Sequence, residues 1–268
     1  GLLGALCGRR PLAVTAWGSD LLVAGGRDPL QRARARFVLG RADLVLADAA
    51  NLARAARALG APAARVHEVP WGVDLERFRS SGVREPELLL STRMHEPIYD
   101  LETLIAGVAP LMGRRPGPHL VVAGDGSMRG ALERLAARLL PAGRYRFVGM
   151  QTPAALAQWL ARAGVYLSAA RSDSTSISLL EAMAAGALPV VTDIEGNREW
   201  VIEGDGARMF PAGVPEALTD ALALALDAPE WAAAARLRNR RVVEARGDRD
   251  RSLDRIEALF AALVAGRV

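Results

Sequence analysis

A regular alternation of short apolar runs with longer amphipathic segments most constrains the fold of this chain. The longer segments, such as Leu101–Met112 and Met128–Leu140, carry apolar residues at the three- and four-residue spacing of helices. This alternation predicts β-α-β units whose parallel sheets are covered by helices on both faces. The predicted strands are Pro11–Trp17, Asp43–Asp48, Ala64–Pro70, Glu87–Thr92, His119–Gly124, Arg144–Gly149, Gly164–Ala169, Leu188–Asp193 and Ala207–Ala212.

The chain divides where this alternation breaks. Ser80–Gly82 and Pro86 interrupt the pattern, and such residues favour turns and linkers. We therefore predict an α/β fold with a short parallel-sheet unit in residues 1–80 and a larger one in residues 81–228. Residues 229–268 are predicted to form helices only, which we expect to pack back toward the first unit.

The composition excludes several classes of protein. With 51% hydrophobic and 24% charged residues, the 268-residue chain is typical of a globular protein. No apolar run reaches the roughly 18 residues that a bilayer-spanning helix needs. The single cysteine, Cys7, allows no internal disulfide and fits a reducing cytoplasm. The histidines are scattered without metal-ligand spacing, so no metal site is predicted.

The net charge of +4 rests on arginine, because the sequence contains no lysine. Genomic base composition explains such a bias, and attraction to phosphorylated substrates or to an anionic membrane face is the functional alternative. The basic segment Leu30–Arg41 is the candidate for peripheral contact with a membrane. Aromatic residues are sparse and the arginines are scattered, so the sequence does not predict binding of nucleic acid.

Polar, loop-forming residues follow the predicted strands of the larger unit. Open parallel sheets bind their ligands beyond the carboxyl ends of the strands, so we expect the ligand site at this edge. The residues that follow these strand ends are Arg93, Gly124–Ser127, Met150–Gln151, Arg171–Ser178 and Ile194–Asn197.

The stretch from Ser172 to Glu181 places two acids around small polar residues at the predicted start of a helix. Unpaired amides and the helix dipole favour a phosphate there, and Arg93 adds a fixed cation. Asp173 and Glu181 repel phosphate but suit sugar hydroxyls, so the predicted ligand is a nucleotide diphosphate sugar. The structural alternative is that Asp173 or Ser174 caps the helix and that Glu181 faces solvent.

The same stretch resembles the donor-site signature of retaining glycosyltransferases with the GT-B fold, in the large family 4, or group 1. In that signature an acid, seven residues and a glutamate are followed by an apolar helix and a strand. Asp173, Glu181, Gly186 and Pro189–Val191 stand in this order. The resemblance extends over the chain from about Pro11. It implies two Rossmann-like domains with parallel sheets, and we expect the N-terminal, acceptor-side domain to be incomplete at its start.

The resemblance also implies roles for the matching residues. Arg93 pairs with the donor diphosphate, Asp173 holds hydroxyls of the donor sugar, and Glu181 holds the ribose. Gly149 and Met150 line the base pocket through their backbone. A further set of residues is expected to contact the donor or its phosphates. They are Gly124, Gly126, Ser174, Thr175, Ser176, Ile177 and Ser178.

Three departures from the family pattern are visible. The usual lysine is absent from Glu96–Asp100, which leaves the diphosphate to Arg93 alone or with another arginine. The first acid is aspartate where glutamate is usual, which is expected to alter the sugar preference. Trp17 replaces the histidine that is expected to point at the donor sugar. Asp20 is then either a polar group in the cleft or a helix cap, and His95 is a further candidate for ligand contact.

The predicted function is transfer of a hexose from a UDP- or GDP-linked donor, with retained configuration and without a metal or other cofactor. The acceptor is a sugar, a lipid or a small molecule. Two alternatives stay open. A non-catalytic nucleotide-sugar binding protein is made plausible by Trp17 and the short first domain, and an epimerase on the same fold is disfavoured by the scarcity of acid–base groups. The expected location is the cytoplasm, including the inner face of the membrane.

Overall fold

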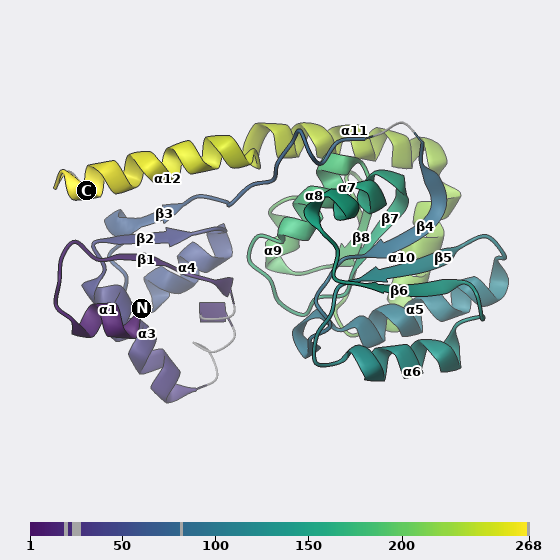
Figure 1. Cartoon of the computed structure of the whole chain (residues 1–268), viewed down its shortest axis with the longest axis horizontal. Coiled ribbons are helices and arrows are strands. Elements are labelled where there is room, and N and C mark those ends of the chain that lie inside the picture. The colour runs from purple at the N-terminus through teal and green to yellow at the C-terminus, as the bar shows by residue number, and fades with distance from the viewer. Residues whose placement is uncertain (19–20, 23–27, 81–82, 267–268) are drawn as a thin grey trace.

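The structure is a computed structural model that describes residues 1–18, 21–22, 28–80 and 83–266. Two parallel sheets lie side by side along the long axis of the molecule (Figure 1). Every strand that the sequence predicted is present, some of them shortened at the ends. The first sheet has the order β1-β2-β3, formed by Ala13–Thr15, Leu44–Ala47 and Val66–Glu68.

The second sheet has the order β6-β5-β4-β7-β8-β9, and its strand order reverses beside β4. Leu89 of β4 is paired with Leu120 of β5 on one side and with Val165 of β7 on the other. Such a reversal opens a crevice at the carboxyl ends of the two central strands, where doubly wound sheets bind ligands. The strands are β4 (Glu85–Ser91), β5 (His119–Ala123), β6 (Tyr145–Gly149), β7 (Ala163–Ser168), β8 (Leu188–Thr192) and β9 (Arg208–Phe210).

Helices cover both faces of the second sheet, as the sequence predicted. Successive strand residues point to opposite faces, so Leu89 belongs to one buried cluster while Leu88 and Leu90 belong to another. The face of Leu89 is covered by α5 (Leu101–Arg114), α6 (Arg129–Leu139) and α10 (Pro215–Asp227). The opposite face is covered by α7 (Pro153–Arg162), α8 (Ile177–Ala185) and α11 (Pro229–Arg246).

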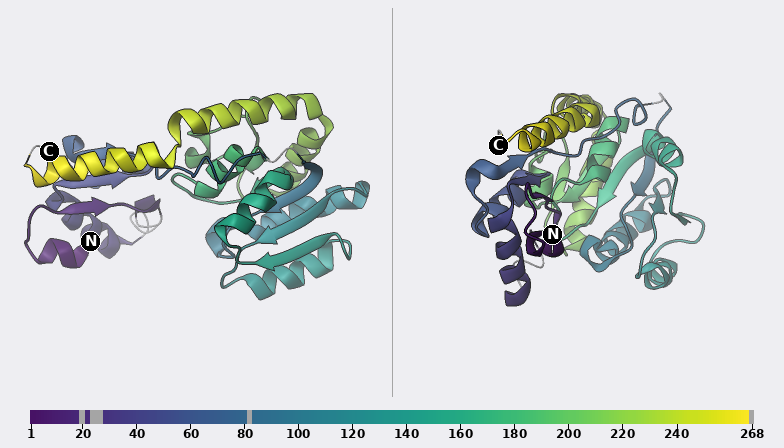
Figure 2. Two further views of the ribbon diagram at one scale, coloured as in Figure 1. Left: turned by 45° about the horizontal axis from the view of Figure 1, so that its top comes forward. Right: turned by 60° about the vertical axis from the view of Figure 1, so that its left-hand side comes forward.

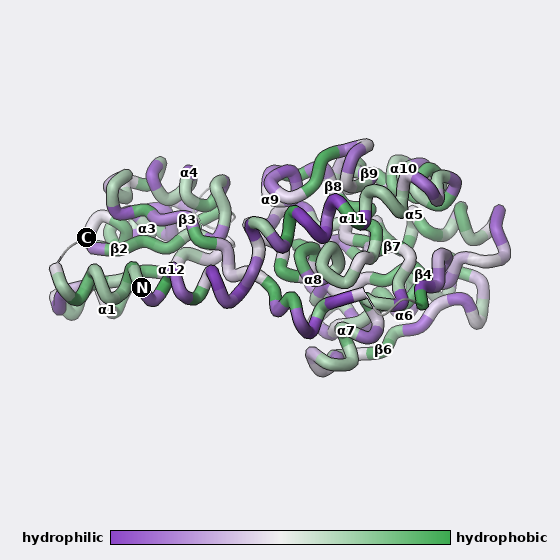
Figure 3. Tube along the Cα trace, turned by 90° about the horizontal axis from the view of Figure 1, so that it is seen from above, coloured by the Kyte–Doolittle hydropathy of each residue, from purple (hydrophilic) through white to green (hydrophobic). Residues whose placement is uncertain are grey.

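The first sheet is covered by helices from both ends of the chain. Among its own helices are α1 (Leu2–Leu6), α3 (Pro29–Arg41) and α4 (Ala50–Ala58). Near the C-terminus, α12 (Arg249–Val264) lies along this sheet (Figure 2). Its residues Ile256 and Leu263 share a buried cluster with Leu44, Leu46 and Val69. In Figure 3, α12 carries both hydrophobic and hydrophilic residues along its length, as expected for a helix with one buried face.

The chain crosses between the two sheets twice, and the crossings lie against each other. The amide of Val73 donates to the carbonyl of Gly247 at 2.8 Å, and the amide of Arg249 donates back to the carbonyl of Val73 at 3.2 Å. Gly72 has a φ of +72°, and a Cβ there would lie 2.6 Å from the amide nitrogen of Arg249. Glycine is therefore required at position 72, where the two connecting segments lie against each other. None of the helices in the described ranges is long and apolar enough to cross a membrane.

Candidate active site

A cavity of about 320 Å³ lies at the carboxyl ends of β4 and β7, where the strand order reverses. Both sheets contribute to its lining. The second sheet supplies 92–94, 98–99 and the loop 172–178 that leads into α8, and the first supplies Trp17, Gly18, Asp48 and Trp71. The cavity therefore lies between the two domains and includes the loop that the sequence predicted as a donor site.

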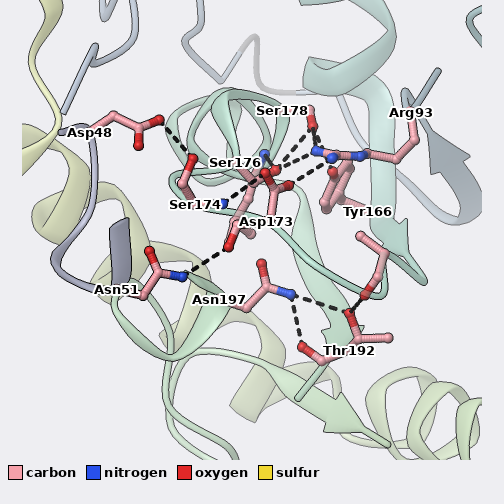
Figure 4. A network of polar contacts seen from close by, with 12 residues as sticks. Asp48, Asn51, Arg93, Tyr166, Asp173, Ser174, Ser176, Ser178, Thr192 and Asn197 are labelled. Atoms are coloured by element: carbon pink, nitrogen blue, oxygen red, sulfur yellow. Dashed lines mark hydrogen bonds and ion pairs between the residues drawn. The ribbon is translucent and has the colours of Figure 1, made fainter. Parts of the chain in front are cut away.

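Arg93 joins the loop 172–178 to the end of β4. Its guanidinium donates to the hydroxyls of Ser176 and Ser178 at 2.6 and 2.7 Å and forms an ion pair with Asp173 at 2.7 Å (Figure 4). It also lies 4.1 Å above the centre of the Tyr99 ring. Only 7% of Arg93 is exposed. Burial is the strongest single influence and lowers the pKa of Arg93, but the charge and hydrogen bond of Asp173, together with Tyr166 and Tyr99, outweigh it and the pKa is raised.

The start of α8 is arranged to receive an anion. Ser176 is its N-cap, and the Ser176 hydroxyl accepts a hydrogen bond from the amide of Leu179 at 3.3 Å. The first amides of a helix have no partner within the helix, and the helix dipole adds positive potential at this end. The guanidinium of Arg93 lies beside the same turn. Such a combination of groups could hold a phosphate.

The carboxylate of Asp173 is anchored on both oxygens. Oδ2 faces Arg93, and Oδ1 accepts from the amide of Ser174 at 3.1 Å. Gly196 packs behind the same turn, where a Cβ would lie 2.2 Å from the carbonyl oxygen of Ser174. An ionised carboxylate has about four acceptor positions, so Asp173 retains capacity for hydroxyls of a ligand.

Glu181 lies on α8, one to two turns after the loop, and is partly buried. It does not belong to the lining of the 320 Å³ cavity. Burial raises the pKa of Glu181 to about 7, against the opposing effect of Arg93. Glu181 is therefore a carboxyl group that changes charge near neutral pH, in the same helix whose start faces the cavity.

The glycines predicted to contact the donor lie at the carboxyl ends of β5 and β6, on one side of β4. The amide of Gly124 donates to the carbonyl of Gly149 at 2.9 Å, and Met150 is 63% exposed. Cβ atoms at Gly124 and Gly126 would lie 2.5 and 2.6 Å from the carbonyl oxygens of Arg93 and His95. The loop therefore needs glycine to pack against the segment that carries Arg93.

The structure places the two further predicted cleft residues His95 and Trp17 differently. His95 is fully buried beneath the loop of Gly124 and does not line the cavity. Its amide donates to the carbonyl of Asp125 at 2.9 Å, which turns the chain under that loop. Trp17 does line the cavity, where it stacks on Trp71 with 5.9 Å between ring centres. Asp20 lies outside the described residues.

The sequence analysis missed Asp48, which reaches the loop 172–178 from the first sheet. Its carboxylate accepts from the hydroxyl of Ser174 at 3.0 Å, and its carbonyl accepts from the hydroxyl of Thr175 at 2.5 Å. Burial raises the pKa of Asp48 to about 6, against the hydrogen bond from Ser174. A signal for it was present, because Asp48 is the last residue of the predicted strand Asp43–Asp48 and directly follows β2.

Glu199 is the second residue that the sequence analysis missed. Helix α4 begins after Ala49, whose side chain cannot cap it. Glu199 of the second domain accepts from the amides of Ala50 and Asn51, both at 2.9 Å. The side chain of Asn51 in turn donates to the carbonyl of Asp173 at 3.0 Å. A carboxylate of one domain thus caps a helix of the other beside the cavity.

Replacing Glu199 by alanine is expected to loosen the contact between the domains. The change leaves two helix amides without their charged partner, which typically costs about 1–2 kcal/mol. We expect a lower melting temperature and a larger radius of gyration in small-angle scattering. The matched control is Glu195→Ala, because the ion pair of Glu195 with Arg54 is exposed on both sides and contributes little. Equal scattering profiles for both variants would contradict this role.

Comparison with known proteins identifies the family. Residues 85–228, which include every strand of the second sheet, match the family model of the glycosyl transferases group 1. The chain belongs to this family. The likeness of this chain to solved structures confirms the predicted GT-B architecture. HepE of Anabaena in complex with UDP-glucose superposes with a TM-score of 0.84 at 19% identity, over 97% of this chain and 76% of HepE.

Sucrose-phosphate synthase of Thermosynechococcus elongatus superposes with a TM-score of 0.83 at 20% identity, over 96% of this chain and 68% of that one. Among curated relatives, a phosphatidyl-myo-inositol mannosyltransferase of Mycobacterium tuberculosis is 31% identical over 58% of this chain and 42% of its own length. A D-inositol 3-phosphate glycosyltransferase of Catenulispora acidiphila is 31% identical over 65% of this chain and 45% of its own. The chain thus spans less than half the length of these two curated relatives.

Proposed function

We propose that the chain carries the donor site of a hexosyltransferase that uses a nucleotide diphosphate sugar and retains the anomeric configuration. The observation that carries the proposal is the junction of Arg93, Asp173 and the start of α8 at the strand reversal. This junction offers positive potential for a diphosphate. Within one helical turn it also offers a carboxylate that can accept hydrogen bonds from hydroxyls. Retention is supported by the order of Asp173, Glu181 and the following strand, which resembles retaining family 4 enzymes.

In the proposed reaction, the bond between the anomeric carbon and the diphosphate oxygen breaks. A bond from that carbon to an acceptor oxygen forms on the same face, and the acceptor proton leaves with the diphosphate. The developing charge is stabilised by Arg93 and the amides at the start of α8, which are fixed before the reaction begins. Asp173 and Glu181 orient the sugar and the ribose. These residues need no metal for this chemistry, and we propose none.

The donor base and the acceptor belong to the same proposal. A UDP-linked donor is supported by the likeness to HepE, whose structure contains UDP-glucose, and GDP-linked donors are the alternative. We propose a cytoplasmic location, with contact at an anionic membrane face through the basic helix α3, Pro29–Arg41. The acceptor is a sugar, lipid or other small molecule.

The proposal is tested with full-length protein and a panel of UDP-, GDP- and ADP-linked hexoses. We expect at least one donor to release its nucleoside diphosphate, faster when an acceptor mixture is added. Nuclear magnetic resonance of the product should show the anomeric configuration of the donor. Binding of nucleotide without any turnover would contradict catalysis and indicate a nucleotide-sugar binding protein. An altered sugar on the recovered donor would indicate an epimerase.

A further inference from the structure

Each of the three strands of the first sheet is followed by a residue that lines the cavity. Trp17 follows β1, Asp48 directly follows β2, and Trp71 follows β3. Because the strands are parallel and adjacent, their carboxyl ends bring these side chains to one edge. This edge faces the loop 172–178, so it forms the wall of the cavity opposite the proposed donor site.

Trp17 is exposed to an extent that packing does not explain. It keeps 60% of its surface exposed although it stacks on Trp71 with an angle of 24° between the rings. Large apolar side chains that are exposed inside a hollow commonly mark binding sites. The indole face carries a negative quadrupole, which attracts the weakly positive C–H hydrogens on the face of a sugar ring. The stacked pair therefore offers a flat surface of the chemistry that a pyranose ring needs.

Asp48 offers a hydrogen-bond acceptor beside this surface. Only 8% of Asp48 is exposed, and Oδ2 is held by Ser174. Oδ1 has no hydrogen-bond partner within the described part of the chain. Leaving a buried carboxylate oxygen unpaired costs free energy. A ligand hydroxyl that donates to Oδ1 would remove this cost.

The charges of the cavity favour a neutral ligand on this wall. Among the described residues that line it, the one cationic side chain is Arg93, which belongs to the opposite wall and is paired with Asp173. Asp48 and Asp173 both repel a phosphate. An acceptor that presents a phosphate here would meet no cation among the described first-sheet residues that line the cavity.

We propose that Trp17, Trp71 and Asp48 form a subsite for a neutral pyranose ring of the acceptor. The acceptor would then be a glycoside, in contrast to the inositol phosphate of the relative's name. The face of the ring packs on the indoles, and a ring hydroxyl donates to Asp48. This inference rests on the proposed function, because it assigns the second substrate of the same cavity.

Saturation-transfer nuclear magnetic resonance on full-length protein with UDP tests the subsite. The probes are methyl α-D-glucopyranoside, methyl α-D-mannopyranoside and myo-inositol 1-phosphate. We expect saturation of the ring C–H protons of at least one glycoside and weaker saturation of the inositol phosphate. Trp17→Ala should lower the glycoside signal about five- to tenfold. Trp17→Phe should retain most of it, Asp48→Asn should lower it, and the control Trp231→Ala on α11 should leave it unchanged.

Several results would overturn the subsite. They are a Trp17→Ala signal equal to that of wild type, no glycoside signal in wild type, and stronger binding of the inositol phosphate. If Trp17→Ala instead weakened binding of UDP-glucose relative to UDP while no glycoside bound, the ring on the indoles would belong to the donor. In each of these cases, measured binding of UDP would leave the proposed donor site standing. Absence of binding of UDP, GDP and ADP alike would remove the proposed function itself.

Discussion

Arg93→Ala is expected to lower donor turnover by at least about 100-fold, the usual effect of removing one group that stabilises transition-state charge. The guanidinium is the cation that lies beside the start of α8, and it also fixes Ser176, Ser178 and Asp173. Its loss removes charge stabilisation and leaves the carboxylate of Asp173 without its partner. The measurement is release of nucleoside diphosphate from the active donor.

Two variants separate catalysis from folding. Arg93→Lys keeps the charge but loses the planar fork, so it should recover part of the activity. Arg198→Ala removes an exposed arginine that is paired with Asp193 at the edge of the same domain, and it should behave as wild type. Near-normal turnover by folded Arg93→Ala protein would exclude Arg93 from the site. If Arg93→Ala fails to fold while the other variants fold, the activity of Arg93→Lys becomes the test.

Glu181→Gln is expected to change how stability depends on pH. The pKa of Glu181 is about 7 in the folded chain, above the ordinary value of 4.5 for a glutamate, because burial disfavours its charge. Between these two values the folded state holds a proton that the unfolded state has lost, so stability falls as pH rises through this range. Glutamine has no such proton. The stability of the Glu181→Gln variant relative to wild type should therefore rise by on the order of 2 kcal/mol between pH 5 and pH 8.

Thermal unfolding at several pH values, with Glu257→Gln as an exposed control on α12, measures this difference. A gap between wild type and Glu181→Gln that stays constant with pH would contradict the raised pKa. Nucleotide binding gives a second readout. An ionised Glu181 accepts the ribose hydroxyl better, so wild type should gain UDP affinity over Glu181→Gln, by roughly tenfold, as pH rises from 6 to 8.

The architecture was predictable because buried parallel strands are short, nearly continuous apolar runs. Leu88–Leu90 and Val165–Leu167 are entirely buried, and their sequences contain no competing helical period. The carboxyl-end rule then located Arg93 and the loop of Asp173 without any structure. Applied to the first sheet as well, the same rule would have found Asp48.

Contacts between the domains could not be predicted from the sequence. Glu199 lies far along the chain from α4, and its role depends on how the two sheets face each other. The one local hint was Ala49, a poor N-cap at the start of a helix. His95 is a candidate for ligand contact that the sequence alone could not place. Its closeness to Arg93 in sequence suggested ligand contact, but a backbone hydrogen bond to Asp125 turns it under the glycine loop.

Calorimetric titration of wild type and Arg93→Ala with UDP, GDP and ADP tests the central claim most directly. The claim is that the cavity at the start of α8 binds a nucleoside diphosphate through Arg93 and the helix amides. Wild type should bind one molecule of at least one of the three. Arg93→Ala should bind it at least about tenfold more weakly. Absence of binding by wild type, or equal binding by the folded variant, would contradict the claim.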